Sequence, residues 1–75
     1  MANRDPVQVA FGQNVRKRRE ARCFTQDVLA ERAGLDRTYI SDIERGMRKP
    51  GIKNVARLAK ALGIVSSKLM EGVEA

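Results

Sequence analysis

Two short helices joined by a tight turn are predicted between Thr25 and Gly46, and this pair constrains the fold more than any other feature of the sequence. Thr25 and Asp36 each precede a run of apolar residues at helical spacing. Both are suitable N-caps, because their side-chain oxygens accept a hydrogen bond from a backbone N–H group. Gly34 and Gly46 follow the two runs, where a helix commonly ends on a left-handed residue. Helices this short are marginal alone, so the rest of the chain must pack against them.

Turn signals divide the remaining sequence into three further helical segments. Asp5 and Pro6 suit the N-cap and the first position of a helix that precedes the pair. Gly63 ends a long amphipathic segment after the pair, and Ser66 is predicted to cap a short last helix. The predicted fold is therefore all-α, a single domain over residues 1–75 with five short helices. The expected helices cover about residues 6–22, 26–33, 37–45, 52–62 and 67–71.

The segment before Gly63 has the cleanest helical stripe in the chain. Its apolar residues recur at i, i+3, i+6, i+7 and i+10, so we expect them to lie on one face and to point into the core. The residues of this stripe are Ile52, Val55, Leu58, Ala59 and Leu62.

The charge balance favours a polyanion as partner. Fifteen Lys and Arg residues oppose nine Asp and Glu residues, which gives a net charge of +6. Nucleic acid and an anionic membrane surface both fit this balance. No apolar run approaches the roughly 20 residues that span a bilayer, and the first residues lack the apolar stretch of a signal peptide. The expected location is cytoplasmic.

The residues that carry enzyme chemistry are missing or wrongly spaced. The chain has no His, and its single Cys23 has no neighbouring base to activate it. No Cys, His and carboxylate residues stand at the spacing of a metal site. Asp42 and Glu44 are two apart on a predicted helix and therefore lie on different faces. We expect no catalytic activity, no metal or cofactor and no small-molecule ligand.

Arg19 stands where an apolar residue is expected. Val7, Phe11 and Val15 recur every four residues along the first predicted helix, and Arg19 continues this stripe. Its side chain should therefore point inward. A guanidinium in the interior requires a carboxylate partner, because an unpaired buried charge is very unfavourable.

The second helix of the central pair has two different sides. Ile40 and Ile43 face the core, and small or charged residues lie on the outer side, which fits a DNA major groove about 12 Å wide. The segment TQDVLAERAGLDRTYISDIERG resembles the helix-turn-helix of the Cro/CI-type (XRE) repressor family. Gln26, Ala30 and Gly34 also stand at that motif's spacing. The similarity extends to R-x-x-R in the first helix, to ERG after the third and to KALGI at the end of the fourth.

This resemblance implies a lambda-repressor-like DNA-binding domain and a sequence-specific transcriptional regulator. The stretch LDRTYISDIERG is especially similar to the small controller proteins of restriction–modification systems. The implied partners are double-stranded DNA with a palindromic operator and a second copy of the chain; a membrane is not an expected partner. Two other classes remain open. One is an antitoxin-like protein that binds a toxin and, secondarily, DNA; the other is a basic helical adaptor.

The resemblance also implies roles for individual residues. Arg19 and Glu44 correspond to the family's buried ion pair. Base readout would involve Arg37, Thr38, Ser41, Asp42 and Arg45. Phosphate contacts would come from Arg16, Gln26, Tyr39, Arg48, Lys49, Lys53 and Asn54. Asp42 is unusual on such a surface: it could accept from cytosine, pair with Arg37 or Arg45, or repel wrong sequences.

Two features of the sequence have more than one interpretation. Cys23 stands where the family usually has Gly, so either this residue is left-handed and strained or the turn differs. A redox-sensing thiol is an alternative role. The C-terminal end is rich in apolar residues that either cap the core or form a two-fold dimer interface. We predict the interface, because a monomer makes few base contacts. Its residues would be Leu62, Ile64, Val65, Leu69 and Met70.

Overall fold

Five α-helices make up the described part of the computed structural model, which covers residues 4–74. In chain order they are α1 (Pro6–Ala21), α2 (Gln26–Ala33), α3 (Arg37–Glu44), α4 (Ile52–Leu62) and α5 (Ser66–Leu69). These residues contain no strand, so the predicted all-α class with five short helices is confirmed. α2 and α4 have the expected bounds, whereas α1 and α3 end one residue earlier than expected.

The ends of the central helices follow local chemistry. The Thr25 hydroxyl accepts a hydrogen bond of 3.1 Å from the backbone nitrogen of Val28 and so caps α2. Gly34 ends α2 with a φ of 69°, in the left-handed region that favours glycine. Asp36 has the extended backbone of an N-cap, but its side chain makes no capping hydrogen bond. The predicted position of the α3 cap is therefore right, and the predicted side-chain bond is wrong.

The prediction for α5 is also wrong in its details. Val65, and not Ser66, is the N-cap, and Ser66 is the first helical residue. The helix ends at Leu69, two residues before the expected end. Val65 has no side-chain oxygen, so α5 begins without a side-chain cap, and the burial of Leu69 holds it in place instead.

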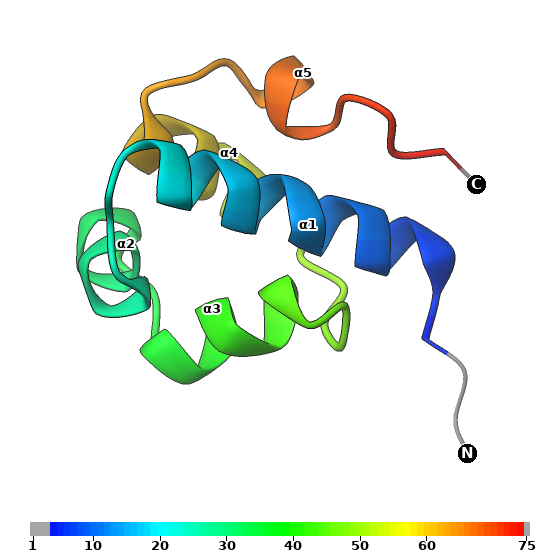
Figure 1. Ribbon diagram of the computed structural model, residues 1–75, viewed down its shortest axis with the longest axis horizontal. Helices are drawn as coiled ribbons and strands as arrows, with labels where there is room; N and C mark the ends of the chain where they lie inside the picture. The colour runs from blue at the N-terminus through cyan, green and yellow to red at the C-terminus, as the bar shows by residue number, and fades with distance from the viewer. Residues whose placement is uncertain (1–3, 75) are drawn as a thin grey trace.

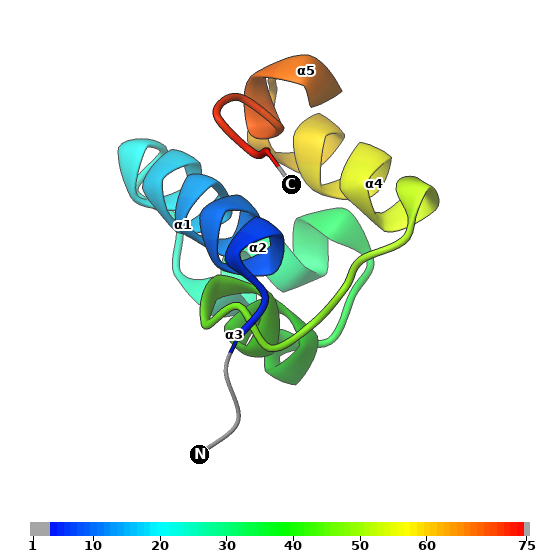
Figure 2. The same cartoon turned by 90° about the vertical axis from the view of Figure 1, so that its right-hand side faces the viewer.

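One apolar core lies between all five helices. α1 packs against α3, α4 and α5, and α2 packs against α3 and α4. Figures 1 and 2 show α3 and α5 at opposite ends of the molecule, with α1 and α4 side by side between them. The buried apolar residues are Phe11, Val15, Leu29, Ala30, Ala33, Ile40, Ile43, Leu58, Ala59, Leu62 and Leu69.

Ile52 does not belong to this core, contrary to the predicted stripe. Its relative exposure is 91%, whereas Leu58, Ala59 and Leu62 on the same helix are buried. Val55, one turn after Ile52, is the first residue of α4 that packs against the core. The first turn of α4 therefore extends past the core, and helical spacing alone does not reveal where along its axis a helix meets its neighbours.

Cys23 adopts the strained conformation that was one of its two interpretations. Its φ is 57°, the only positive value at a non-glycine residue among residues 4–74. A left-handed residue with a Cβ atom costs roughly 1 kcal/mol or more. The turn between α1 and α2 thus has the geometry that a glycine would give, at some cost in stability. The thiol is exposed.

Two glycines allow α1 and α3 to approach each other closely. A Cβ atom at Gly12, in the middle of α1, would overlap the backbone oxygen of Ile43. At the end of α3, a Cβ atom at Gly46 would lie 2.7 Å from Cγ2 of Val9. Backbone oxygens of a packed helix cannot move aside easily, so these positions fix the distance between α1 and the central pair.

Replacement of Gly12 tests this close contact. In an unpacked helix, Gly→Ala would stabilise the protein by up to about 1 kcal/mol. Gly12→Ala should instead lower the free energy of unfolding by about 1–3 kcal/mol, because α1 and α3 must separate. Urea unfolding followed by circular dichroism measures this value. The control is Gly51→Ala, where a Cβ atom meets nothing within 4 Å. Equal stability of the two variants would contradict the account.

Candidate nucleic-acid interface

The outer side of α3 displays most of the predicted base-reading residues. Ile40 and Ile43 are 0% and 1% exposed and hold the inner side of the helix in the core. Arg37, Thr38 and Arg45 are exposed on the other side. The remaining two predicted readers, Ser41 and Asp42, are half-buried. Figure 1 shows α3 at the edge of the molecule, and its main packing partners are α1 and α2.

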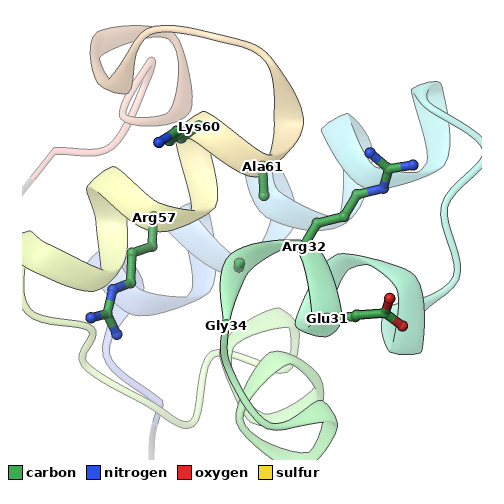
Figure 3. A pocket seen from close by; sticks show the side chains of 7 residues that line it. Glu31, Arg32, Gly34, Arg57, Lys60 and Ala61 are labelled. Carbon is green, nitrogen blue, oxygen red and sulfur yellow. The ribbon is translucent and has the colours of Figure 1, made fainter.

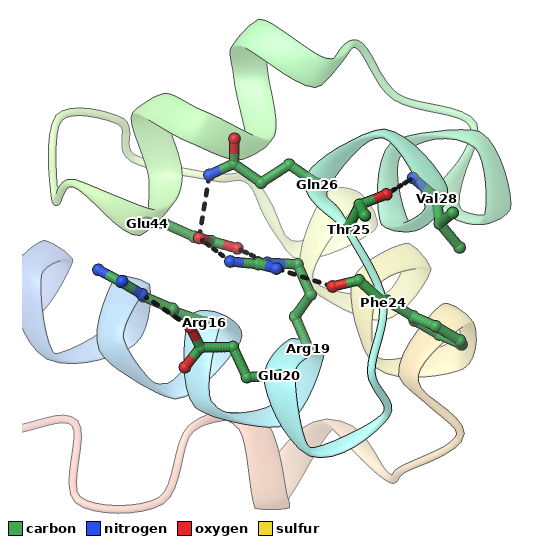
Figure 4. A network of polar contacts seen from close by, with 8 residues as sticks. All are labelled: Arg16, Arg19, Glu20, Phe24, Thr25, Gln26, Val28 and Glu44. Atoms are coloured by element: carbon green, nitrogen blue, oxygen red, sulfur yellow. Dashed lines mark hydrogen bonds and ion pairs between the residues drawn. The ribbon is translucent and has the colours of Figure 1, made fainter.

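Arg19 of α1 and Glu44 of α3 form the ion pair that the family resemblance implies (Figure 4). The Arg19 Nε and Nη2 atoms donate to the two carboxylate oxygens of Glu44 at 2.6 and 3.1 Å. A third guanidinium nitrogen donates to the backbone oxygen of Phe24 at 2.7 Å. The Gln26 amide donates to Glu44 Oε1 at 3.1 Å. One guanidinium thus joins α1, the turn before α2, and the end of α3.

The side chains of both members are largely enclosed by the protein. The side chains of Arg19 and Glu44 are 12% and 4% exposed. The hydrogen bonds that Arg19 donates to the Glu44 carboxylate raise the pKa of Arg19 above its ordinary value, although burial acts in the opposite direction. The guanidinium therefore stays charged. Net stabilisation by a buried pair is small against an apolar replacement, but removal of one partner leaves an unpaired charge. The pair consequently fixes the orientation of α3 relative to α1.

Gln26 has a second partner besides the phosphate that the sequence predicts. It lies at the first position of α2, where free backbone N–H groups favour an anion. In the protein without DNA, its side-chain amide donates to Glu44. The phosphate contact stays a prediction, and it would place the phosphate next to the buried network.

Arg37 has a partner that the sequence reasoning missed. Its Nε atom lies 3.3 Å from Asp27 Oδ1, and the two side chains are 65% and 74% exposed. The residues are ten apart on different helices, so no helical period relates them. Exposed pairs of this kind contribute little to stability. Arg37 can therefore leave Asp27 for a stronger partner at small cost.

Tyr39 joins α3 to the segment that follows it. The Asn54 amide donates a hydrogen bond of 2.9 Å to the Tyr39 hydroxyl, which connects the first turns of α3 and α4. The Arg48 guanidinium lies 5.1 Å from the centre of the Tyr39 ring, within the range of a cation–π contact. The three residues were all predicted to contact phosphate. The structure brings them together, and their contact with DNA stays a prediction.

The other predicted phosphate ligands lie on the surface. Lys49 and Lys53 are exposed in and just after the loop between α3 and α4. Arg16 is exposed on α1, where it pairs with Glu20 at 3.3 Å. These cations lie in α1 and near the start of α4, so they would contact the DNA backbone away from α3.

A large open groove lies elsewhere, between the C-terminal end of α2 and α4 (Figure 3). Its volume is about 610 Å³, and it shares no residue with the predicted interface. The Arg32 guanidinium, at its edge, lies 4.8 Å from the centre of the Phe24 ring. The lining residues are Glu31, Arg32, Ala33, Gly34, Arg57, Lys60 and Ala61. A second groove, of about 440 Å³, does adjoin the predicted interface, because Thr38, Tyr39, Arg48 and Asn54 are among its lining residues.

The predicted dimer interface requires correction. Leu62 and Leu69 are 1% and 0% exposed, because both helices turn these residues into the core. They cannot contact a second molecule. Val65 and Met70 are exposed at 63% and 41%, and Ile64 is half-buried against the core.

An exposed apolar surface adjoins Met70, and we call it the Ile52 face. It surrounds a shallow groove of about 310 Å³ between the start of α4 and α5. Sequence reasoning missed it because Ile52 was placed in the core. The face consists of Pro50, Ile52, Val55, Ala56, Ser66 and Met70.

Residues 4–74 contain neither a metal site nor a membrane span. No three His, Cys, Asp or Glu side chains in this part of the chain are placed to hold a metal ion. None of its helices has the length and apolar character needed to cross a membrane.

Known sequences resemble this chain over most of its length. A helix-turn-helix family profile matches residues 15–69. The control protein C.BamHI of Bacillus amyloliquefaciens is 41% identical over 66 residues, which are 87% of this chain and 82% of that protein. The control protein C.MunI of Mycoplasma sp is 35% identical over 69 residues, 91% of this chain and 93% of the other.

Solved structures agree with these similarities. The restriction-modification controller protein C.AhdI from Aeromonas hydrophila superposes with a TM-score of 0.81 and 42% identity, covering 83% of this chain and 94% of that one. The controller protein C.Esp1396I was solved as a tetramer in complex with its natural 35 base-pair operator. It superposes with a TM-score of 0.83 and 32% identity, over 92% of this chain and 91% of its own.

The Arg19–Glu44 network predicts that a single replacement destabilises the protein more than replacement of both residues. Arg19→Ala should lower the free energy of unfolding by about 3–5 kcal/mol, because the Glu44 carboxylate is left without its counter-charge in the interior. Replacement of both residues, Arg19→Met with Glu44→Leu, should recover most of this loss. The control Arg16→Ala removes an exposed pair and should cost less than about 1 kcal/mol. Urea unfolding measures all three. A stable Arg19→Ala variant that has lost DNA binding would show that Arg19 contacts DNA directly.

Proposed function

The chain belongs to the helix-turn-helix family of DNA-binding transcription regulators, and we propose that it controls a restriction–modification system by binding a palindromic operator as a homodimer. It would act on DNA in the cytoplasm. The observation that carries the proposal is the exposed outer side of α3, held at a fixed angle by the Arg19–Glu44 pair. Similarity to the control proteins over nearly the whole chain supports the choice of regulated system.

Base readout would begin at the N-terminal end of α3. The Arg37 guanidinium has two parallel donors that match guanine O6 and N7 in the major groove, and the Thr38 methyl group fits the thymine methyl. Ser41 and Arg45 lie one and two turns further along the same side. Because Arg37 is held only by the exposed Asp27, it can reach a base without breaking the core.

Phosphate contacts would fix the register of α3 in the groove. The first turn of α2 offers backbone N–H groups with Gln26, and Arg16 is on α1. On the other side, Lys49 and Lys53 follow α3 in the chain. Such contacts carry no base information, but they supply most of the salt-dependent affinity.

Dimerisation would use the Ile52 face together with Val65. Ile52, which is 91% exposed, adjoins Met70, which is 41% exposed, so the apolar residues form a continuous patch of the kind that marks an interaction surface. Figure 2 shows α4 and α5 on one side of the molecule and α3 at its lower end, so a second copy against that side leaves both α3 helices uncovered. The molecule measures 32 × 24 × 22 Å. A second copy on the side of α4 and α5 would bring a second α3 to a neighbouring half-site, about one helical turn away on the DNA.

Selection of binding sites from random duplex DNA tests the proposal. The wild-type protein should enrich a palindromic motif with half-sites about one helical turn apart. Arg37→Ala should lose the preference at one position in each half-site and weaken binding to the selected DNA by about 1–3 kcal/mol. Unchanged preference in this variant would remove Arg37 from the readout, and absence of any enriched motif with the wild type would refute sequence-specific binding.

Lys49→Ala tests a predicted phosphate contact, in contrast to the base contact that Arg37→Ala tests. It should weaken binding to selected and unrelated DNA equally, and it should lower the slope of log affinity against log salt by about one. Fluorescence anisotropy titrations at several salt concentrations measure both quantities. A change in base preference would be inconsistent with a purely phosphate-binding Lys49.

Ile52→Glu tests the dimer surface. A charge at the centre of the Ile52 face should convert the dimer to monomer at micromolar concentration, while the helical circular dichroism spectrum stays the same. Sedimentation velocity distinguishes the two species. Val28→Glu, an equivalent change at an exposed apolar residue of α2, serves as control and should stay dimeric. Dissociation of neither variant, or of both, would place the interface elsewhere.

A further inference from the structure

Asp42 has an unexpected position for an acidic residue. It lies on α3, the helix that would enter the groove, where a carboxylate is repelled by the phosphates. The sequence allowed contact with cytosine, pairing with an arginine, or repulsion of wrong DNA. The contacts of the carboxylate decide among these roles.

Asp42 is in contact with two arginines at once. Its Oδ1 atom lies 3.5 Å from Arg45 Nη2, and its Oδ2 atom lies 3.6 Å from Arg48 Nε. The Asp42 side chain is 22% exposed, whereas the two arginines are 59% and 53% exposed. The carboxylate is therefore set back from the surface, with a guanidinium in front of each of its oxygens.

Arg48 is held from a second direction as well. Its guanidinium lies over the Tyr39 ring, and the Tyr39 hydroxyl is fixed by the Asn54 amide at 2.9 Å. Asp42 contacts Arg48 through Nε, which leaves the two terminal nitrogens for another partner. Arg45 has one further contact, from Nη2 to the Ser41 hydroxyl at 3.3 Å. Both arginines are thus oriented before any DNA arrives.

Stability does not explain this arrangement. Ion pairs of 3.5 and 3.6 Å with arginines that are more than half exposed contribute little to the free energy of folding. In binding, however, a long arginine side chain loses less conformational entropy when it is already oriented. The same carboxylate lowers the net charge of the three-residue cluster from +2 to +1, which weakens attraction to any phosphate backbone regardless of sequence.

We propose that Asp42 is a specificity-determining residue that acts through Arg45 and Arg48 and makes no base contact of its own. It orients the two arginines for the operator and reduces affinity for unrelated DNA. On the operator, both arginines find partners in the geometry that Asp42 imposes. On unrelated DNA they must leave Asp42 to reach phosphates, and the carboxylate is then exposed to phosphates without its counter-charges.

This inference rests on the proposed function, because discrimination can be measured only for a protein that selects DNA. The test compares the wild type with Asp42→Asn, which removes the charge and keeps the shape. Glu31→Gln is the matched control, since it removes one negative charge from an exposed position of α2 outside the predicted interface. Affinity for the selected site and for unrelated duplex is measured at several salt concentrations, and unfolding by urea confirms that each variant is folded.

Asp42→Asn should bind unrelated duplex more tightly, with a salt slope steeper by up to about one. The ratio of selected to unrelated affinity should fall about tenfold. Site selection with this variant should show weaker preference at the position that Arg45→Ala affects. Asp42→Asn combined with Arg48→Ala should lose less than the sum of the two single losses, because the residues act as one unit.

Three results would overturn the inference. An unchanged affinity ratio and salt slope in Asp42→Asn would leave Asp42 without a role in discrimination. Loss of preference at one base pair that neither arginine variant affects would show direct contact with a base. An equal effect of Glu31→Gln would show that the change in affinity follows from the net charge of the protein and not from the position of Asp42. Failure of the wild type to select any site would instead overturn the proposed function itself.

Discussion

The buried Arg19–Glu44 pair is the interaction on which the rest of the structure depends. Two charges removed from water are stable only when hydrogen bonds replace their hydration. Here Arg19 donates to the backbone oxygen of Phe24, and the Gln26 amide donates to Glu44, in addition to the bonds within the pair. Four separate parts of the chain must therefore meet at one point: the end of α1, the turn after it, the start of α2 and the end of α3. An apolar contact in the same place would allow the helices to slide against each other. This network of directional hydrogen bonds permits only one orientation of α2 and α3 relative to α1.

The remaining contacts follow from that orientation. Gly12 and Gly46 let α1 lie directly on α3, so α3 is supported along its inner side and needs no cover on its outer side. The outer side can then carry the residues that we propose to contact DNA. The Ile52 face is formed by other elements and lies on another side of the molecule (Figure 2). A small domain thus separates its reading surface from the surface that would pair it with a second copy, and each can change without the other.

The sequence predicted those features that depend on neighbouring residues or on a helical period. The cap at Thr25, the left-handed Gly34 and the inward direction of Arg19 are local properties, and all are present. The resemblance supplied Glu44 as the partner. The wrong predictions depend on how far neighbouring helices overlap along their axes. Leu62 and Leu69 were predicted at the dimer interface but lie in the core, and Ile52 was predicted in the core but lies outside it. The contacts of Asp42 with Arg48 and of Arg37 with Asp27 join different segments, and no periodicity indicates them.

The central claim is that α3 reads bases from the major groove at two half-sites, and methylation interference tests it most directly. Methylation at guanine N7 modifies the major groove, and methylation at adenine N3 modifies the minor groove. The account predicts interference at guanine N7 in two clusters about one helical turn apart, related by the symmetry of the operator, with little effect at adenine N3. Interference confined to adenine N3, or a single cluster at guanine N7, would contradict it.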